Sequence, residues 1–265
     1  MPPGDIRNCM IALSEDENLM SQLFRYRFTG KGELHDHSFG NLFLTAMAGV
    51  TGDFAEAVRL TTEVLAIRGR IYPSTNSQVT LCAEFDDGQR IEGETKISQA
   101  GKRVQKVWLN PPGAEPLEAS LQAIAAADVI TIGPGSLYTS IIPNLLVDKI
   151  ARAVEASRAT KIYIQNIMTQ PGESQGLTVS GHVEAMARHT GGKLLFSRIL
   201  LNNAVPSEEL LARYKAEGAE VVVLDRDRLE ALGLESAELD LLAQDQVIRH
   251  DPDRLAAAVF DMAKI

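Results

Sequence analysis

This chain is poor in cysteine, tryptophan and basic side chains. Its 265 residues include two cysteines and one tryptophan, and 26 lysines and arginines stand against 35 aspartates and glutamates. The formal net charge of −9 argues against a nucleic-acid partner, because phosphate backbones bind to basic faces. Cys9 and Cys82 lie in apolar contexts and match no metal-ligand spacing. We expect both to be buried free thiols.

Long apolar runs are missing as well. No stretch approaches the roughly 20 apolar residues that a membrane-spanning helix needs, and no signal peptide precedes the first predicted element. The hydrophobic fraction of 45% and the charged fraction of 23% are typical of a globular protein with a core. These absences predict a cytoplasmic protein with no membrane span.

The pattern of the chain changes near residue 67 and again near Pro116. Apolar residues at helical spacing predict helices at 19–26, 42–47 and 53–66. Alternating apolar and polar residues then predict an antiparallel β insert around residues 67–110, with a hairpin turn at Asp86-Asp87-Gly88.

From Pro116 onward, helical and strand patterns alternate. The expected strands lie at 128–132, 161–166, 194–201 and 220–224. The expected helices lie at 116–126, 145–157, 182–190, 207–217 and 253–263. Such alternation predicts a parallel sheet with right-handed crossovers and helices on both faces. The expected fold class is α/β, a three-layer Rossmann-like parallel sheet with the antiparallel insert, in a single domain over residues 1–265.

The segment Val129–Ser140 carries the most informative local signal. A short β-favouring run is followed by the turn Gly133-Pro134-Gly135-Ser136, with Ser136 and Thr139 placed to cap a following helix. Glycines let a backbone approach a ligand closely, and free N–H groups at a helix start suit a phosphate. Ligands of open parallel sheets bind at the carboxyl ends of strands, so this turn is a candidate ligand loop. The alternative is an ordinary strand-to-helix turn, and spacing alone does not separate the two.

Two more strand ends carry uncharged polar side chains. Asn166, Thr169 and Gln170 follow the strand at 161–166, and Asn202 follows the apolar run that ends at Leu201. Amide and hydroxyl groups at one sheet edge suit recognition of an uncharged polar ligand. The alternative is a set of hydrogen-bonded turns, in which asparagine is common.

Seven motifs together resemble one protein family. In chain order they are Pro3–Asn8, His37–Leu42, Thr51–Ala57, Ile132–Ser140, Pro143–Leu146, Asn166–Glu173 and Arg249–Pro252. They are similar to motifs of the YvcK-type gluconeogenesis factors, which are related to the 2-phospho-L-lactate transferases (CofD). The resemblance extends from Pro3 to about Ala258. It implies a CofD-like fold and a protein that binds a nucleotide sugar such as UDP-N-acetylglucosamine. It also implies a role in regulation of cell shape and in growth on gluconeogenic carbon sources.

The resemblance and the residue chemistry together give a set of candidate ligand-binding residues. They are Asn8, His37, Asn41, Gly133, Gly135, Ser136, Asn166, Thr169, Gln170 and Asn202. For Asn41, which begins an apolar helix, the alternative is a helix-capping amide. His35 and His37 lie too close together in one loop to indicate a metal site, so a polar loop contact is favoured. We expect no catalytic residue, no metal ligand and no cofactor beyond a UDP-sugar or dinucleotide ligand.

The start of the chain departs from the family pattern. Family members begin with a strand, a Gly-Gly-Gly-Thr-Gly turn and an aspartate-rich loop, none of which precedes Pro3 here. The resemblance therefore implies amino-terminal truncation and weakened nucleotide binding, and a homo-oligomer would cover the unpaired strand edge. In the related transferases, carboxylates near this point handle a divalent metal and the attacking hydroxyl, and only Asp5 remains. A binding protein with a protein partner of unknown identity is favoured. The alternative is a transferase acting on a phosphorylated or nucleotide substrate.

Overall fold

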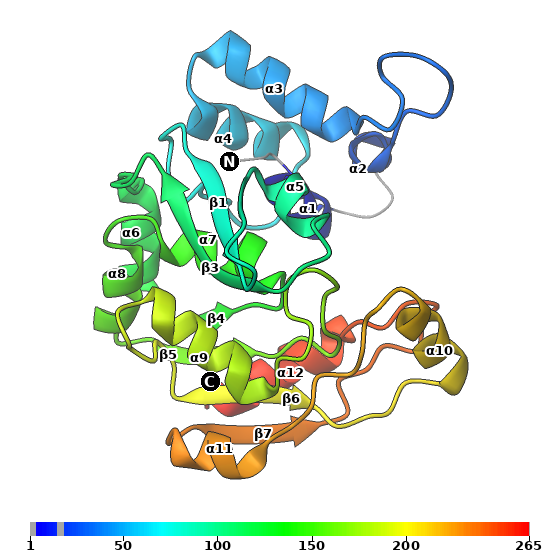
Figure 1. Ribbon diagram of the computed structural model, residues 1–265. Coiled ribbons are helices and arrows are strands. Elements are labelled where there is room, and N and C mark those ends of the chain that lie inside the picture. Colours follow the sequence, from blue (N-terminus) through cyan, green and yellow to red (C-terminus); the bar gives the residue numbers. More distant parts are fainter. Residues whose placement is uncertain (1–3, 15–18, 265) are drawn as a thin grey trace. The chain divides into compact units, whose positions relative to one another are not determined.

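The structure, a computed structural model, describes residues 4–14 and 19–264 and divides into two compact units (Figure 1). The first unit comprises Met1–Gln78 and Glu115–Ser120, and the second comprises Val79–Ala114 and Leu121–Ile265. That the chain is a single domain stays a prediction. None of the described helices combines the length and the apolar character needed to cross a membrane.

Four helices make up most of the first unit. They are α1 (Gly4–Leu13), α2 (Leu19–Arg25), α3 (Phe39–Thr51) and α4 (Phe54–Val64). Ser38 caps α3 by accepting from the Asn41 N–H, and Asp53 caps α4 by accepting from the Glu56 N–H. The apolar faces of these helices meet in one cluster, which contains Ile6, Met10, Phe24, Leu44, Val58 and Leu65. The helices expected at 19–26, 42–47 and 53–66 are therefore present.

The second unit contains the predicted antiparallel insert. Strands β1 (Thr80–Phe85), β2 (Arg90–Glu92) and β3 (Val104–Asn110) form a sheet in the order β2-β1-β3. All its pairs are antiparallel, and Cys82 lies opposite both Glu92 and Trp108. A short helix, α5 (Glu94–Ser98), follows β2. The antiparallel insert predicted around residues 67–110 is therefore present.

The second sheet is parallel, as predicted. Its strands are β4 (Val129–Ile132), β5 (Thr160–Ile164), β6 (Arg198–Asn202) and β7 (Glu235–Leu239), paired in that order. The fourth strand was wrongly expected at 220–224. That segment makes only an isolated antiparallel bridge, between Val221 and Met168. β7 is an edge strand whose residues are exposed or half-buried, so it lacks the apolar run that marks a buried strand.

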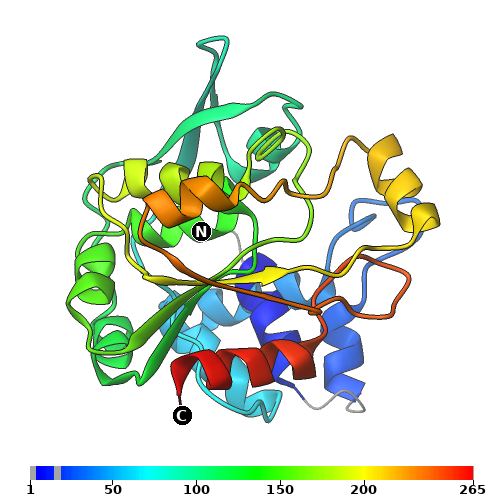
Figure 2. The ribbon, with the colours of Figure 1, turned by 90° about the horizontal axis from the view of Figure 1, so that it is seen from below.

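Helices cover both faces of the parallel sheet. Ile162, Ile164 and Leu200 face α12 (Pro252–Ala263), and they pack in one cluster with Ala258. Tyr163 and Ile199 point to the other face and join the cluster that holds Val183 and Met186 of α9 (Val179–His189). Figure 2 shows α9 and α12 on opposite sides of the strands. The alternation of side chains along each strand thus makes the three-layer arrangement.

The remaining helices correct several details of the prediction. The helix expected at 145–157 is divided into a π-helical turn η1 (Leu137–Ile141), α7 (Ile142–Leu145) and α8 (Ile150–Ala156). Ser136 precedes η1 but its side chain makes no capping hydrogen bond. The other helices are α6 (Glu118–Ala126), α10 (Glu208–Ala216) and α11 (Arg226–Ala231). Both cysteines are free, but Cys9 is exposed and only Cys82 is buried.

Candidate functional site

The turn after β4 is fastened to the loop after β5. The Gly135 N–H donates to Asn166 Oδ1 at 3.0 Å, and Asn166 Nδ2 donates to the Gly135 carbonyl at 2.7 Å. Gln170 Nε2 donates to Ser136 Oγ at 2.7 Å. Four of the predicted ligand-binding residues therefore lie together at the carboxyl edge of the parallel sheet. The Gly135 N–H is already used by Asn166, so this group does not need a phosphate as an acceptor.

Gly133 has a structural requirement for glycine. Its φ is +77°, and an added Cβ would lie 2.9 Å from the Ile164 carbonyl oxygen of β5. The sequence prediction explained this glycine by close approach of a ligand. In the fold the close approach is made by the neighbouring strand, and direct contact of Gly133 with a ligand stays a prediction.

A buried carboxylate supports the same turn. Glu173 is 3% exposed, and its Oε1 accepts from Thr139 Oγ1 at 2.8 Å and from Ser98 Oγ at 3.1 Å. Thr139 belongs to η1 and Ser98 to α5, so one side chain ties the β4 turn to the antiparallel insert. π-helical turns such as η1 often occur at functional sites. Glu173 closes the motif Asn166–Glu173, but its bond to Ser98 spans 75 residues and has no local signal.

Several buried polar atoms around this edge lack a hydrogen-bond partner within the part of the chain that the structure describes. They are Gln165 Oε1, Gln170 Oε1, Glu173 Oε2 and His250 Nε2. Three of the four are oxygens that can accept a hydrogen bond. Burial lowers the pKa of His250, and a hydrogen bond with the Gln165 backbone partly offsets this effect. The edge therefore offers acceptors to a donor that the protein itself does not supply.

The side chains of Thr169 and Asn202 form hydrogen bonds with backbone groups of neighbouring loops. Thr169 Oγ1 accepts from the Glu220 N–H at 2.9 Å, and the Thr169 N–H donates to the Glu220 carbonyl at 2.7 Å. Asn202 Oδ1 accepts from the Leu241 N–H at 3.0 Å, while its Nδ2 donates to the Ala204 carbonyl at 2.7 Å. These bonds make both residues organisers of the loops at the carboxyl edge. Ligand contact by either one stays a prediction.

The remaining predicted residues gather in the first unit, at the amino end of α3. His37 and Asn41 lie on either side of the cap residue Ser38, and Asn8 Oδ1 accepts from Arg7 Nη2 at 2.8 Å. Asn41 is not the capping residue that the alternative interpretation supposed, because Ser38 takes that role. The Asn41 Oδ1 atom is buried and has no partner among the described residues.

The amino end of α9 holds a polar cluster around Asp225, a residue that the sequence prediction did not name. Asp225 accepts from the Ser180 N–H at 3.0 Å and also from the Ser180 hydroxyl. Burial pushes the pKa of Asp225 upward, but the bonds from Ser180 outweigh it and the pKa ends below its ordinary value. His182 is fully buried, and its Nδ1 lies 2.9 Å from the Thr178 carbonyl oxygen. Because His182 bonds to the backbone and not to Asp225, these residues form a helix cap and not a nucleophilic triad.

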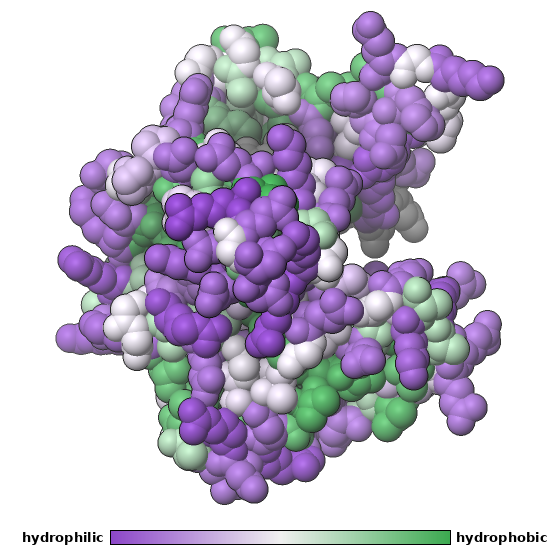
Figure 3. Space-filling view, viewed as in Figure 1, coloured by the Kyte–Doolittle hydropathy of each residue, from purple (hydrophilic) through white to green (hydrophobic). Residues whose placement is uncertain are grey.

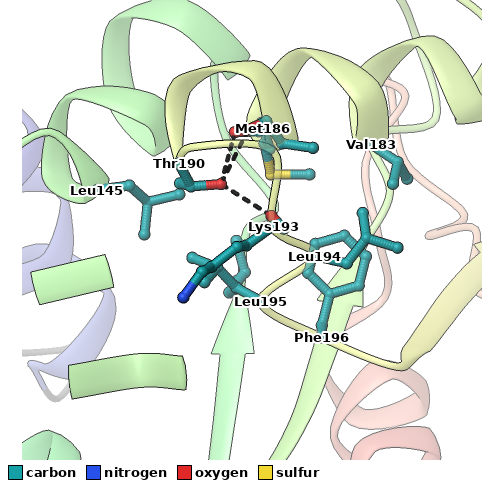
Figure 4. A pocket seen from close by; sticks show the side chains of 10 residues that line it. Leu145, Val183, Met186, Thr190, Lys193, Leu194, Leu195 and Phe196 are labelled. Carbon is teal, nitrogen blue, oxygen red and sulfur yellow. Dashed lines mark hydrogen bonds between the residues drawn. The ribbon is translucent and has the colours of Figure 1, made fainter. Parts of the chain in front are cut away.

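Two hollows in the second unit lie away from this edge. A space of about 190 Å³ beneath α9 is lined mainly by apolar side chains such as Val183, Met186 and Phe196 (Figure 4). Its crevices are too narrow for a water molecule, and the Thr190 hydroxyl beside it bonds to nearby carbonyls. An open hollow of about 390 Å³ lies at the amino ends of β5 and β6, lined in part by Lys161 and Arg198.

Those two cations are already engaged. Lys161 Nζ donates to the Ser157 carbonyl at 2.8 Å, and Arg198 pairs with Glu235 at 3.1 Å. Hydrophobic side chains also appear over the ends of β6 and β7 (Figure 3). Leu239, the last residue of β7, is 41% exposed. The chemistry therefore favours the carboxyl edge over the open hollow.

Across the described ranges, no group of three histidine, cysteine, aspartate or glutamate side chains could hold a metal ion.

Comparison with known proteins gives a consistent result. A sequence profile described as 2-phospho-L-lactate transferase CofD matches residues 1–242. Proteins named "Gluconeogenesis factor" from Halalkalibacterium halodurans and Bacillus subtilis (strain 168) are each 43% identical to this chain. The alignments cover 98% and 99% of the chain and 81% and 83% of those proteins. A relative from Nostoc sp. (strain PCC 7120) is 47% identical over 97% of the chain, which spans 57% of that relative's length.

A solved structure has the same fold. The crystal structure of a Bacillus halodurans protein, described as a member of the UPF0052 family, superposes with a TM-score of 0.92. It is 43% identical in sequence, and the match covers 98% of this chain and 83% of that one. At this level of similarity the two chains share both the parallel sheet and the segments around it.

Proposed function

The chain belongs to the CofD family, and from this membership we propose that it is a regulatory protein that binds a nucleotide sugar of the UDP-N-acetylglucosamine type. The names of its relatives from Halalkalibacterium halodurans and Bacillus subtilis support a role connected with gluconeogenic growth. The family resemblance extends this role to cell shape. Regulation of this kind acts through a protein partner and requires no turnover of the ligand.

The observation that carries the proposal is the set of buried acceptors at the carboxyl edge. Gln165 Oε1 and Gln170 Oε1 lack donors among the described residues, and Gln170 also orients the Ser136 hydroxyl. A buried acceptor without a donor is costly, so a ligand that supplies donors gains affinity there. Sugar hydroxyls and an N-acetyl N–H are donors of the right kind, and they need no charged partner.

The competing function is a transferase of the 2-phospho-L-lactate type, which the description of the matching family favours. A metal-assisted or acid–base mechanism uses carboxylates that are free to reach the substrate. Glu173 is the buried carboxylate beside the β4 turn, and one of its oxygens is taken by Thr139 and Ser98. That arrangement suits support of the turn better than proton transfer.

Calorimetric titration of the chain with UDP-N-acetylglucosamine tests the proposal. We expect weak binding, and we expect Ser136→Ala and Gln170→Leu each to weaken it further by about 3- to 10-fold, because each removes about one hydrogen bond. Asn203→Ala is the matched control, since Asn203 follows β6 and its Nδ2 makes a single 3.2 Å bond to the Glu238 carbonyl. Mass spectrometry of the recovered ligand should find it unchanged. Absence of binding would refute the proposal, and product formed from a 2-phospho-L-lactate donor would favour the transferase.

A further inference from the structure

His189, the last residue of α9, bonds to the outer edge of the antiparallel sheet. β3 is the last strand in the order β2-β1-β3, so its far side pairs with no further strand in the part of the chain that the structure describes. On that side the Val107 N–H donates to His189 Nε2 at 3.0 Å, across 82 residues. Both residues belong to the second unit. A side chain of α9 therefore supplies the acceptor that another strand would otherwise provide.

The two partners of the His189 ring determine its protonation state. A backbone N–H can only donate, so Nε2, which accepts from Val107, carries no proton. Nδ1 lies 2.7 Å from the Ala185 carbonyl oxygen, and because a carbonyl can only accept, Nδ1 carries the proton. The ring is therefore the neutral Nδ1–H tautomer. A second proton, on Nε2, would set two N–H donors against each other and break the bond to Val107.

The side chains closest to His189 oppose a second proton. Burial lowers the pKa of His189 most, the bond to the Ala185 carbonyl partly offsets this effect, and the positive charges of Arg188 and Lys106 lower the pKa further. Arg188 lies on α9 and Lys106 on β3. From η1, the Tyr138 ring contacts the His189 ring in a T-shaped arrangement, with centroids 5.9 Å apart. These three neighbours are cationic or neutral near pH 7, so none of them favours an imidazolium.

Other charged side chains line an open hollow of about 360 Å³ that His189 borders. They are the carboxylates Asp148 and Glu155 and the cations Lys149, Arg152 and Lys193. The charge of Glu155 is compensated, because Lys193 pairs with it at 2.7 Å. Cations outnumber carboxylates in this hollow as well. The ring of His189 therefore gains its second proton only below the ordinary histidine pKa of about 6.5.

We propose that His189 is a pH-sensitive connection between α9 and the outer edge of β3, complete while the ring is neutral and open once Nε2 gains a proton. The connection is complete above about pH 6.5 and is lost as the pH falls toward the lower pKa of the folded chain. The opening is local, because Val107 also packs in the apolar cluster that holds Val183 and Met186 of α9. Acid therefore frees the edge of β3 before the chain unfolds. The inference goes beyond the proposed function, since it involves no ligand.

NMR of the full chain tests the protonation state and its consequence. Long-range ¹H–¹⁵N spectra of the histidine rings at pH 7.5 should show His189 as the neutral Nδ1–H tautomer. As the pH is lowered to 5, the Val107 amide signal should shift with the same midpoint as the His189 ring. The Nε2–H tautomer at pH 7.5 would overturn the proposal. A Val107 amide that keeps its signal position after the ring is protonated would also overturn it.

Amide hydrogen exchange separates local opening from loss of the whole fold. The protection factor of Val107 should fall by about 3- to 10-fold when His189 is protonated, because one hydrogen bond is lost. Ile199, a fully buried residue of β6, is the internal reference, and its protection should fall less. Equal losses at both amides would contradict a local opening. A ring that stays neutral until the whole chain unfolds would contradict the pH sensitivity.

Variants at position 189 separate titration from packing. His189→Gln keeps an acceptor for the Val107 N–H but does not titrate, so the Val107 signal should become independent of pH. His189→Leu keeps an apolar side chain beside Tyr138 but has no acceptor, so Val107 protection should already be about 3- to 10-fold lower at pH 7.5. If His189→Leu does not fold, His189→Gln and the unmodified chain decide.

His182→Gln is the matched control. His182 is a buried histidine of the same helix, and its Nδ1 lies 2.9 Å from the Thr178 carbonyl oxygen. This variant should leave the titration of the Val107 amide in place. A Val107 amide that still titrates in His189→Gln, or that stops titrating in His182→Gln, would overturn the assignment to His189.

Discussion

Asn166 and Gly135 are joined by two hydrogen bonds, in which the asparagine amide pairs with both the N–H and the carbonyl of one glycine. This is the pattern that a neighbouring strand would make, supplied by a side chain 31 residues away. It continues the pairing of β4 and β5 beyond their last residues, Ile132 and Ile164. The candidate ligand loop is therefore held in place by the loop of the next strand.

The first prediction concerns this pair. Asn166→Ala removes both bonds and leaves the Gly135 groups unpaired, so we expect the free energy of unfolding to fall by about 1–3 kcal/mol. Asn166→Asp retains an acceptor for the Gly135 N–H but sets an anionic oxygen against the Gly135 carbonyl, and should recover little. Denaturant unfolding measures both variants. Asn203→Ala, which loses a single 3.2 Å bond, is the control, and a larger loss in it than in Asn166→Ala would contradict the prediction.

The second prediction concerns Gly133. Gly133→Ala and Gly176→Ala both place alanine at positive φ, +77° and +71°, so both incur the same conformational cost. Only at Gly133 does the added Cβ meet backbone, the Ile164 oxygen at 2.9 Å. We expect Gly133→Ala to lose about 1–3 kcal/mol more than Gly176→Ala in thermal or denaturant unfolding. Equal losses of stability in the two variants would show that the backbone of β5 moves away from the added Cβ at little cost, and would contradict the prediction.

The third prediction concerns the buried Glu173. Glu173→Ala leaves the hydroxyls of Thr139 and Ser98 without their acceptor and opens a cavity. We therefore expect the free energy of unfolding to fall by about 2–5 kcal/mol. Glu173→Gln keeps an oxygen for both hydroxyls and should lose less. A double-mutant cycle with Thr139→Val isolates the 2.8 Å bond, and we expect a coupling energy of about 1.5–3 kcal/mol because the acceptor is a carboxylate. Additive losses would show that Thr139 does not depend on Glu173.

The fourth prediction concerns pH. Burial lowers the pKa of His182, His189 and His250 below the ordinary value, so the unfolded chain binds more protons than the folded chain near pH 6. The contribution of these neutral histidines to the free energy of unfolding is therefore fully present above the unfolded pKa of about 6.5. It is lost as the pH falls from that value toward the lower pKa of the folded chain. Each histidine contributes at most about 1.4 kcal/mol per pH unit.

Denaturation midpoints measured from pH 7.5 down to pH 5 test this slope. His182→Gln removes one of the three groups and should make the slope shallower. His35→Gln, which changes an exposed ring, is the control. A stability that rises on acidification over this range would contradict the assignment of neutral, buried histidines.

The amino-acid sequence by itself determined the elements whose cause is local. Apolar periodicity marks the helices of the first unit, and β-favouring runs mark β4, β5 and β6, because burial of one face leaves a regular trace along the chain. The turn Gly133–Ser136 and the polar residues after β5 were likewise visible, since parallel strands end at one edge of the sheet.

Only the tertiary structure decided which groups meet. In the structure Asn166 bonds to Gly135, and Glu173 accepts a hydrogen bond from Ser98. The Ser136 hydroxyl accepts from Gln170 and does not cap a helix. The tertiary structure also made β7 of Glu235–Leu239 and left Val221 in a single bridge. A periodic pattern records that a side chain is buried, but it carries no information about its partner. Those partners are set by packing between segments that lie tens of residues apart.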